Sequence, residues 1–188
     1  MNIEDAQANM RHSYFGGAPG LASSAVMWLL AGLVVAARDP QTGVLVLIFG
    51  GMLIHPVAIL GCRILGRPGA HDKANPLGPL ALESTVILLL GVMVAFALSH
   101  FRVELFFPAM LLVIGGRYAT FQTLYGRRVY WLCAGVLASL GLLAAKLSLP
   151  AALTAFGGGL VEAAFSVIVF TQIHRGYKKA DKKGQVET

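Results

Sequence analysis

The chain has 188 residues, of which 56% are hydrophobic and only 13% are charged. Soluble globular domains carry about 25% charged residues, so this composition excludes an ordinary water-soluble domain. Fifteen basic and nine acidic side chains give a net charge of +6; in so apolar a chain, that excess is typical of a cytoplasmic membrane face rather than of nucleic-acid binding.

The first predicted element is a short helix in the N-terminal segment, residues 1–19, which we expect on the cytoplasmic side. Asn2 can cap this helix, and Glu4 and Asp5 suit its first turn. One apolar face is approximated by Ile3, Ala6, Met10 and Tyr14. A helix lying in the membrane interface and a frayed tail are the two interpretations of this segment.

Six charge-poor stretches then follow, each long enough to cross a bilayer core of about 30 Å as a helix. The sequence therefore predicts an all-α polytopic membrane protein with a single membrane domain over residues 1–188. Because the links after the first, third and fifth helices are short, the helices should form three antiparallel hairpins. The predicted spans are 20–37, 43–62, 79–98, 104–125, 129–149 and 150–171.

The distribution of Lys and Arg predicts the orientation. With the N-terminus inside, eleven lie in cytoplasmic segments and three outside, leaving Arg117 uncounted within a span. Under the positive-inside rule, this asymmetry places both termini in the cytoplasm. The basic tail, residues 172–188, should lie against anionic lipid headgroups. The cytoplasmic set is Arg11, Arg63, Arg67, Lys73, Arg127, Arg128, Arg175, Lys178, Lys179, Lys182 and Lys183; the outer set is Arg38, Arg102 and Lys146.

Glu83 and Arg117 form the first candidate site. If the chain turns near Phe101, Glu83 lies 18 residues before the turn and Arg117 16 after it, so their depths differ by about 3 Å. We expect an ion pair lining a cavity open to the cytoplasm, with Thr120 and Tyr118 as further substrate-binding residues. The alternative is that Arg117 snorkels to the interface while Glu83 sits among the headgroups.

Glu162 and His55 form a second candidate set near the middle of the membrane. Each lies 12 residues beyond the predicted start of a helix that runs from outside to inside. A carboxyl and an imidazole at that depth can exchange a proton near neutral pH, so this pair is expected to be proton-linked. The alternatives are a neutral Glu162 bonded to a carbonyl and a structural His55 before a kink at Pro56.

The sequence lacks the motifs of several common classes of enzyme and metal site. The sequence has no His-Glu-x-x-His, no Gly-x-Ser-x-Gly, no paired-Asp metal motif and no Walker loop. Cys62 and Cys133 lie in apolar stretches and offer neither a disulfide framework nor a Cys-x-x-Cys pair. We therefore predict no cofactor, no metal site and no catalytic residue, and we favour a protein that is not an enzyme.

Five segments resemble those of an uncharacterised family of small bacterial polytopic membrane proteins. The resemblance covers most of the chain and implies a place in the bacterial cytoplasmic (inner) membrane, but it implies no activity. The segments are Gly16-Gly17-Ala18-Pro19-Gly20, Asn75-Pro76-Leu77-Gly78, Leu82-Glu83-Ser84-Thr85, Gly115-Gly116-Arg117-Tyr118 and Leu124-Tyr125-Gly126.

The leading functional hypothesis is transport or binding of a small molecule or ion through a polar cytoplasmic-side cavity, linked to protonation of Glu162. One alternative is a regulatory or assembly protein that does not transport and whose polar residues only fix helix register. A second is an intramembrane enzyme. An oligomer or a protein partner is compatible with each of them.

Overall fold

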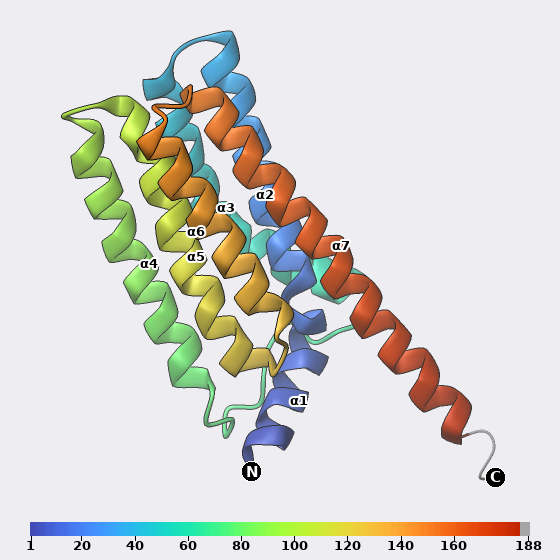
Figure 1. The fold of residues 1–188 in the computed structure, drawn as a ribbon. Helices are drawn as coiled ribbons and strands as arrows, with labels where there is room; N and C mark the ends of the chain where they lie inside the picture. Colours follow the sequence, from blue (N-terminus) through green and yellow to red (C-terminus); the bar gives the residue numbers. More distant parts are fainter. Residues whose placement is uncertain (185–188) are drawn as a thin grey trace.

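A computed structural model describes the backbone of residues 1–184 and the side chains of residues 1–176. This part of the chain is all-helical and contains six segments long and apolar enough to cross a membrane. Seven α-helices of the described residues run along one another (Figure 1). They are α1 (Ile3–Tyr14), α2 (Ala18–Ala37), α3 (Pro40–Ile64), α4 (Gly78–Ser99), α5 (Phe106–Tyr125), α6 (Val129–Lys146) and α7 (Ala151–Gly184), with single 3-10 turns at Phe15–Gly17 and Val103–Leu105.

Local signals in the sequence set the helix ends. Asp39 caps α3, because its carboxylate accepts hydrogen bonds of 2.8 Å from both the amide and the hydroxyl of Thr42. Pro40 then occupies the first position of α3, where its missing N–H is not needed. At the other end of a helix, Gly126 terminates α5 in the left-handed conformation.

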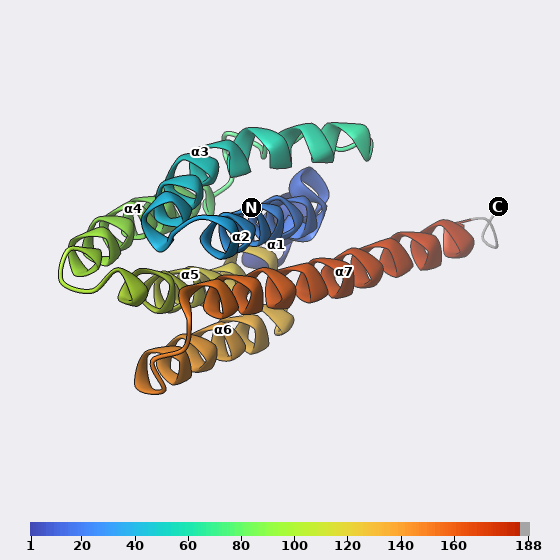
Figure 2. The same ribbon diagram turned by 90° about the horizontal axis from the view of Figure 1, so that it is seen from above.

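The packing order differs from the order of the predicted hairpins. α2 lies between α3 and α7 (Figure 2), and its most extensive contacts are with α7. α6 packs mainly along α5 and less extensively along α7. The last two helices are consecutive in the chain, but they are therefore not each other's main packing partners. The N-terminus and the end of α7 lie at the same end of the bundle (Figure 1).

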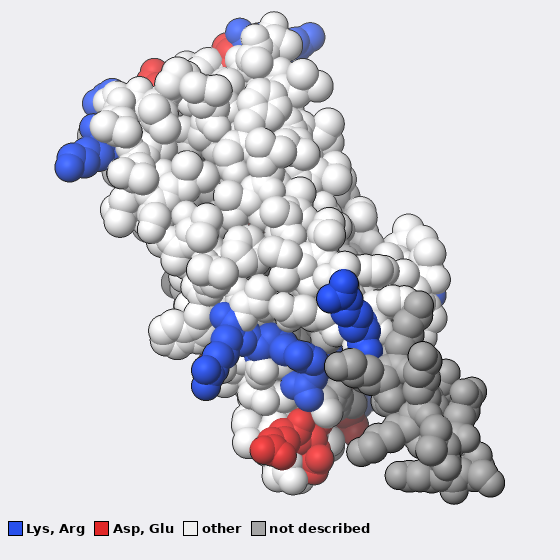
Figure 3. Space-filling view, turned by 45° about the vertical axis from the view of Figure 1, so that its right-hand side comes forward, with Lys and Arg blue, Asp and Glu red and all other residues white. Residues whose placement is uncertain are grey.

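A broad apolar surface surrounds the middle of the bundle. Figure 3 shows Lys and Arg side chains near the two ends of the molecule and none across the middle of the face it displays. α4 illustrates the exposure, since Leu82, Ile87, Leu90 and Met93 are each about 60% exposed or more. Such a surface is stable only against lipid, so the chain is an integral membrane protein.

The N-terminal segment is a helix docked on the bundle. Asn2 caps α1 by accepting from the Asp5 amide, as predicted. Ala6 and Met10 are buried, whereas Ile3 is exposed, so only part of the predicted apolar face packs on the protein. The α3–α4 loop holds α1 in place, because the Asn75 side-chain amide donates to the Ala6 carbonyl at 3.0 Å.

A sharp break separates α1 from α2. Phe15, Gly16 and Gly17 all have positive φ angles, which only glycine adopts at little cost. The break exposes backbone carbonyls, and two side chains from other helices satisfy them. The Tyr130 hydroxyl donates to the Gly16 carbonyl, and the Ser166 hydroxyl donates to the Ala18 carbonyl at 3.0 Å.

The end of the chain departs from the predicted boundary. α7 continues through Gly184, so the segment predicted as a tail from residue 172 begins as an extension of the last helix. The lysines expected to contact anionic headgroups lie outside the described side chains.

Candidate functional site

The centre of the bundle contains a wholly buried carboxyl group. Glu162 of α7 has no solvent-exposed surface. Its Oε1 atom accepts a hydrogen bond of 2.8 Å from the hydroxyl of Tyr118 on α5. The Ser24 hydroxyl of α2 lies close to the same carboxyl group, but Oε2 has no hydrogen-bond partner among the described residues. Three helices therefore converge on one acidic side chain.

Small residues of α7 allow this convergence. A methyl group added at Gly158, one turn before Glu162, would lie 2.7 Å from Leu111 and 3.1 Å from Trp28. One turn after Glu162, Ser166 bonds to the start of α2. Gly158, Glu162 and Ser166 thus share a protein-facing side of their helix.

An aromatic layer separates Glu162 from the α1–α2 break. The Tyr118 ring centroid lies 5.3 Å from that of Phe121 and 6.2 Å from that of Tyr130. Tyr125 packs 5.5 Å from Tyr130 in the same layer. Because Tyr130 also bonds to the Gly16 carbonyl, the layer connects the carboxyl site to the break in the first helix.

Arg117 reaches α4, but it does not reach Glu83. Its Nη2 atom donates to the Thr85 hydroxyl at 3.3 Å, and its guanidinium carbon lies 5.5 Å from the centroid of the Phe121 ring. The Nε atom is buried and has no hydrogen-bond partner among the described residues. Arg117 is also within electrostatic range of the Glu162 carboxyl.

The predicted ion pair between Glu83 and Arg117 is therefore wrong. Glu83 is exposed on the outside of α4, whereas Thr85, two residues later, meets Arg117. Two residues correspond to about 200° of rotation around a helix. The depth estimate located the correct turn of α4, but the side of the helix could not be deduced from it.

Two further predicted site residues have other surroundings. The Thr120 hydroxyl donates to the Arg117 carbonyl of its own helix at 2.7 Å, so this hydrogen bond stays within α5. His55 is exposed on α3, whereas Glu162 is fully buried where α7 packs on α2 and α5. The predicted pairing of His55 with Glu162 is wrong because α7 packs against α2 instead of α3.

Two surface hollows lie away from the carboxyl site. One follows α6, and the other lies where α3 and α4 meet near Phe96 and His100. Neither is lined by Arg117, Glu83, Thr120 or Tyr118. The predicted cavity on the cytoplasmic side does not coincide with either hollow. Within the described residues, no group of three His, Cys, Asp or Glu side chains could hold a metal ion.

Sequence reasoning missed Ser24, Ser166 and Tyr130 as parts of this centre. Ser24 and Ser166 are hydroxyl residues inside otherwise apolar spans, a signal that is weak because such hydroxyls often bond to their own helix. Tyr130 lies near a helix end, where tyrosines commonly belong to an interfacial aromatic belt, but its side chain is wholly buried.

Comparison with known proteins identifies the family. A family of unknown function, DUF7010, matches residues 3–172. The chain belongs to this family. The matched range includes every residue of the carboxyl site, and it agrees with the uncharacterised family expected from the sequence segments. No curated protein and no solved structure matches the chain.

Proposed function

We propose that this member of DUF7010 binds or transports a small molecule or ion, and that Glu162 takes up and releases a proton in the process. In this proposal Tyr118 positions the carboxyl group, and Arg117 supplies positive charge for an anionic ligand. The observation that carries the proposal is the buried carboxyl, of which one oxygen is hydrogen-bonded and the other has no partner among the described residues.

The energetic cost of this arrangement supports a functional role. A carboxyl group in the middle of a membrane protein is expensive, and an oxygen without a partner adds to the cost. A proton on Oε2 or a polar group of a ligand would satisfy that atom. A purely structural role would be served at lower cost by an apolar side chain or an amide, so we assign the carboxyl to proton exchange.

The position of Arg117 supports an anionic ligand. Its guanidinium is half-buried and bonded to Thr85, with a buried Nε atom that has no partner among the described residues. Adjacent positions on α5 thus supply Arg117 and the hydroxyl of Tyr118. An anion bound by Arg117 would change the electrostatic potential at Glu162, which couples ligand binding to protonation.

Infrared spectroscopy tests the protonation step directly. Protein in lipid nanodiscs is titrated from about pH 5 to pH 9, and the carbonyl stretch of protonated carboxyl groups is recorded. We expect one band that changes with pH in the wild type and is missing in Glu162→Gln. Glu83→Gln is the matched control, because this exposed glutamate is on another helix. A spectrum that Glu162→Gln leaves unchanged would refute proton exchange by this residue.

Native mass spectrometry tests the ligand. We expect the protein released from mild detergent to carry a small non-lipid adduct, and Arg117→Ala to lose it. A protein that carries only phospholipid and a stoichiometric protein partner, with no small non-lipid adduct, would contradict the proposal. That result would favour the regulatory or assembly alternative.

A further inference from the structure

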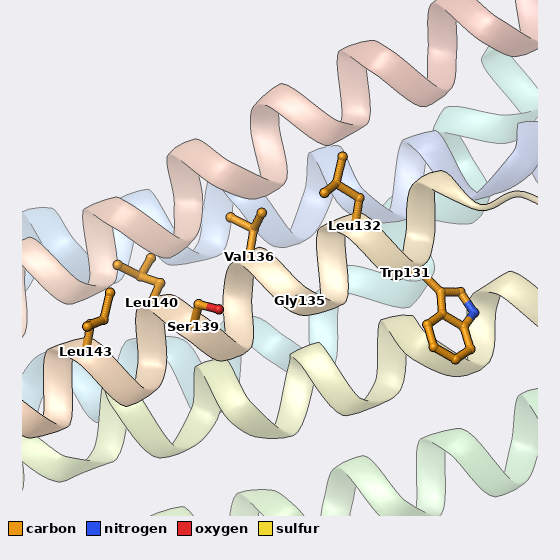
Figure 4. Close-up of a pocket in the computed structure, with 7 residues that line it drawn as sticks. All are labelled: Trp131, Leu132, Gly135, Val136, Ser139, Leu140 and Leu143. Atoms are coloured by element: carbon orange, nitrogen blue, oxygen red, sulfur yellow. The ribbon is translucent and has the colours of Figure 1, made fainter.

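A shallow groove of about 450 Å³ runs along the outside of α6. In Figure 4, Leu132, Val136 and Leu140 point to one side of α6 and Trp131 points to the other. The small residues Gly135 and Ser139 lie between these side chains. From Trp131 to Leu143 the helix rises about 18 Å, comparable to one leaflet of the bilayer core, which is about 15 Å thick. The groove therefore has the length and the apolar lining that suit one acyl chain.

Two arginines stand at one end of this groove. Arg127 and Arg128 form the turn before α6, and the first turn of α6 contains no acidic residue. The Arg128 carbonyl accepts from the amides of Trp131 and Leu132, so Arg128 lies on the helical face that begins the groove. Positive side chains at the positive end of a helix dipole are unfavourable unless an anion is near.

Arg127 has unused hydrogen-bonding capacity at this position. Its side chain is half-buried, and its Nε atom is buried without a hydrogen-bond partner among the described residues. Trp131 is 65% exposed one turn away, where a tryptophan can sit at the level of the headgroups. Positive charge thus adjoins an exposed aromatic ring and an apolar groove.

We propose that an anionic phospholipid binds here, with its phosphate at Arg127 and Arg128 and one acyl chain in the α6 groove. Charge complementarity selects the headgroup, and the length and lining of the groove select the chain. This site lies on the outside of α6, away from the carboxyl site, so it does not depend on the proposed function.

Trp131 reports on this site. The chain has two tryptophans, and the other, Trp28, is 1% exposed inside the bundle. The protein is reconstituted into vesicles of phosphatidylcholine containing brominated phosphatidylglycerol or, in parallel, the same fraction of brominated phosphatidylcholine. We expect the brominated phosphatidylglycerol to quench tryptophan fluorescence more strongly. Trp131→Phe should remove the difference between the two lipids.

Two kinds of variant separate the headgroup from the acyl chain. Each arginine near an anionic headgroup is expected to change relative lipid affinity by about fivefold, so Arg127→Gln with Arg128→Gln should abolish most of the preference. Gly135→Leu fills the groove, because a Cβ atom added at this position points into open space. It should weaken quenching by both lipids. Gly116→Leu is the matched control, since Gly116 is equally unobstructed on α5.

Three outcomes would overturn the proposal. Equal quenching by the two lipids would exclude selection of the headgroup. A preference that persists in the double arginine variant would place the anionic lipid elsewhere. If Gly135→Leu instead changed the oligomeric state in native mass spectrometry and left the lipid preference intact, the groove would be occupied by a second copy of the chain.

Discussion

Replacing Tyr118 by phenylalanine removes the hydroxyl that donates to Glu162 and changes little else. The two atoms are 2.8 Å apart, and the surroundings are dry, since Tyr118 is 5% exposed and Glu162 not at all. Water cannot replace the lost donor without rearrangement. Oε1 would then lose its hydrogen bond, and Oε2 already has no partner among the described residues.

The size of the loss depends on the charge of the carboxyl group. A neutral hydrogen bond contributes about 0.5–1.5 kcal/mol to the free energy of unfolding, and one to a charged group about 1.5–3 kcal/mol. Within membrane proteins the average coupling is nearer 0.6 kcal/mol. We therefore expect Tyr118→Phe to cost about 1 kcal/mol if Glu162 is protonated and about 1.5–3 kcal/mol if it is ionised.

The assay is reversible unfolding in mixed micelles with increasing dodecyl sulfate, followed by tryptophan fluorescence. Tyr118→Phe is measured in the wild type and together with Glu162→Gln, which keeps an acceptor oxygen but cannot ionise. Equal costs in the two backgrounds would indicate a neutral Glu162; a larger cost in the wild type would indicate a carboxylate.

Tyr125→Phe provides the control for losing a tyrosine hydroxyl from the interior of the bundle. Tyr125 lies in the same aromatic layer, and its hydroxyl makes no hydrogen bond to another described residue, so this change should be nearly neutral. If Tyr118→Phe were also neutral, the hydrogen bond to Glu162 would contribute nothing to the free energy of unfolding, which would refute the expected cost.

Three further predictions concern packing, docking and pH. Gly141→Ala should lower the free energy of unfolding by about 1–3 kcal/mol, because the new methyl group would lie 2.8 Å from the Pro108 carbonyl oxygen; the unobstructed Gly135→Ala should be neutral or slightly stabilising in the same unfolding assay. Asn75→Ala should increase amide hydrogen exchange throughout α1 but not in α6, since Asn75 bonds to the Ala6 carbonyl; unchanged exchange in α1 would show that other contacts hold it. Hydrogen bonds from the amide and hydroxyl of Thr42 lower the pKa of Asp39, so its stabilising contribution is present above the ordinary carboxyl pKa and is lost as the pH falls through the lowered value. Asp39→Asn should make the melting temperature less sensitive to acid, and an acid dependence equal to that of the wild type would exclude Asp39 as its source.

The sequence by itself determined the class of the protein and the approximate position of each span. Charge-poor apolar stretches of about 20 residues are typical of membrane spans, and a helix there must satisfy its own backbone. Local signals were equally informative. Asn2 caps α1 as predicted, because a cap depends only on neighbouring residues.

Only the tertiary structure decided which side of each helix meets which neighbour. In a soluble protein the polar side of a helix indicates the direction of solvent, but spans that are apolar all round carry no such signal. The depth of Glu83 was estimated correctly to within one turn, yet Thr85 makes the contact to Arg117.

The partners of Glu162 were decided in the same way. Glycine-mediated close packing places α7 on α2, and this choice joins Glu162 to Tyr118 while leaving His55 exposed on α3. Van der Waals fit between surfaces far apart in the chain selects such contacts, because lipid provides no hydrophobic drive to distinguish one apolar face from another.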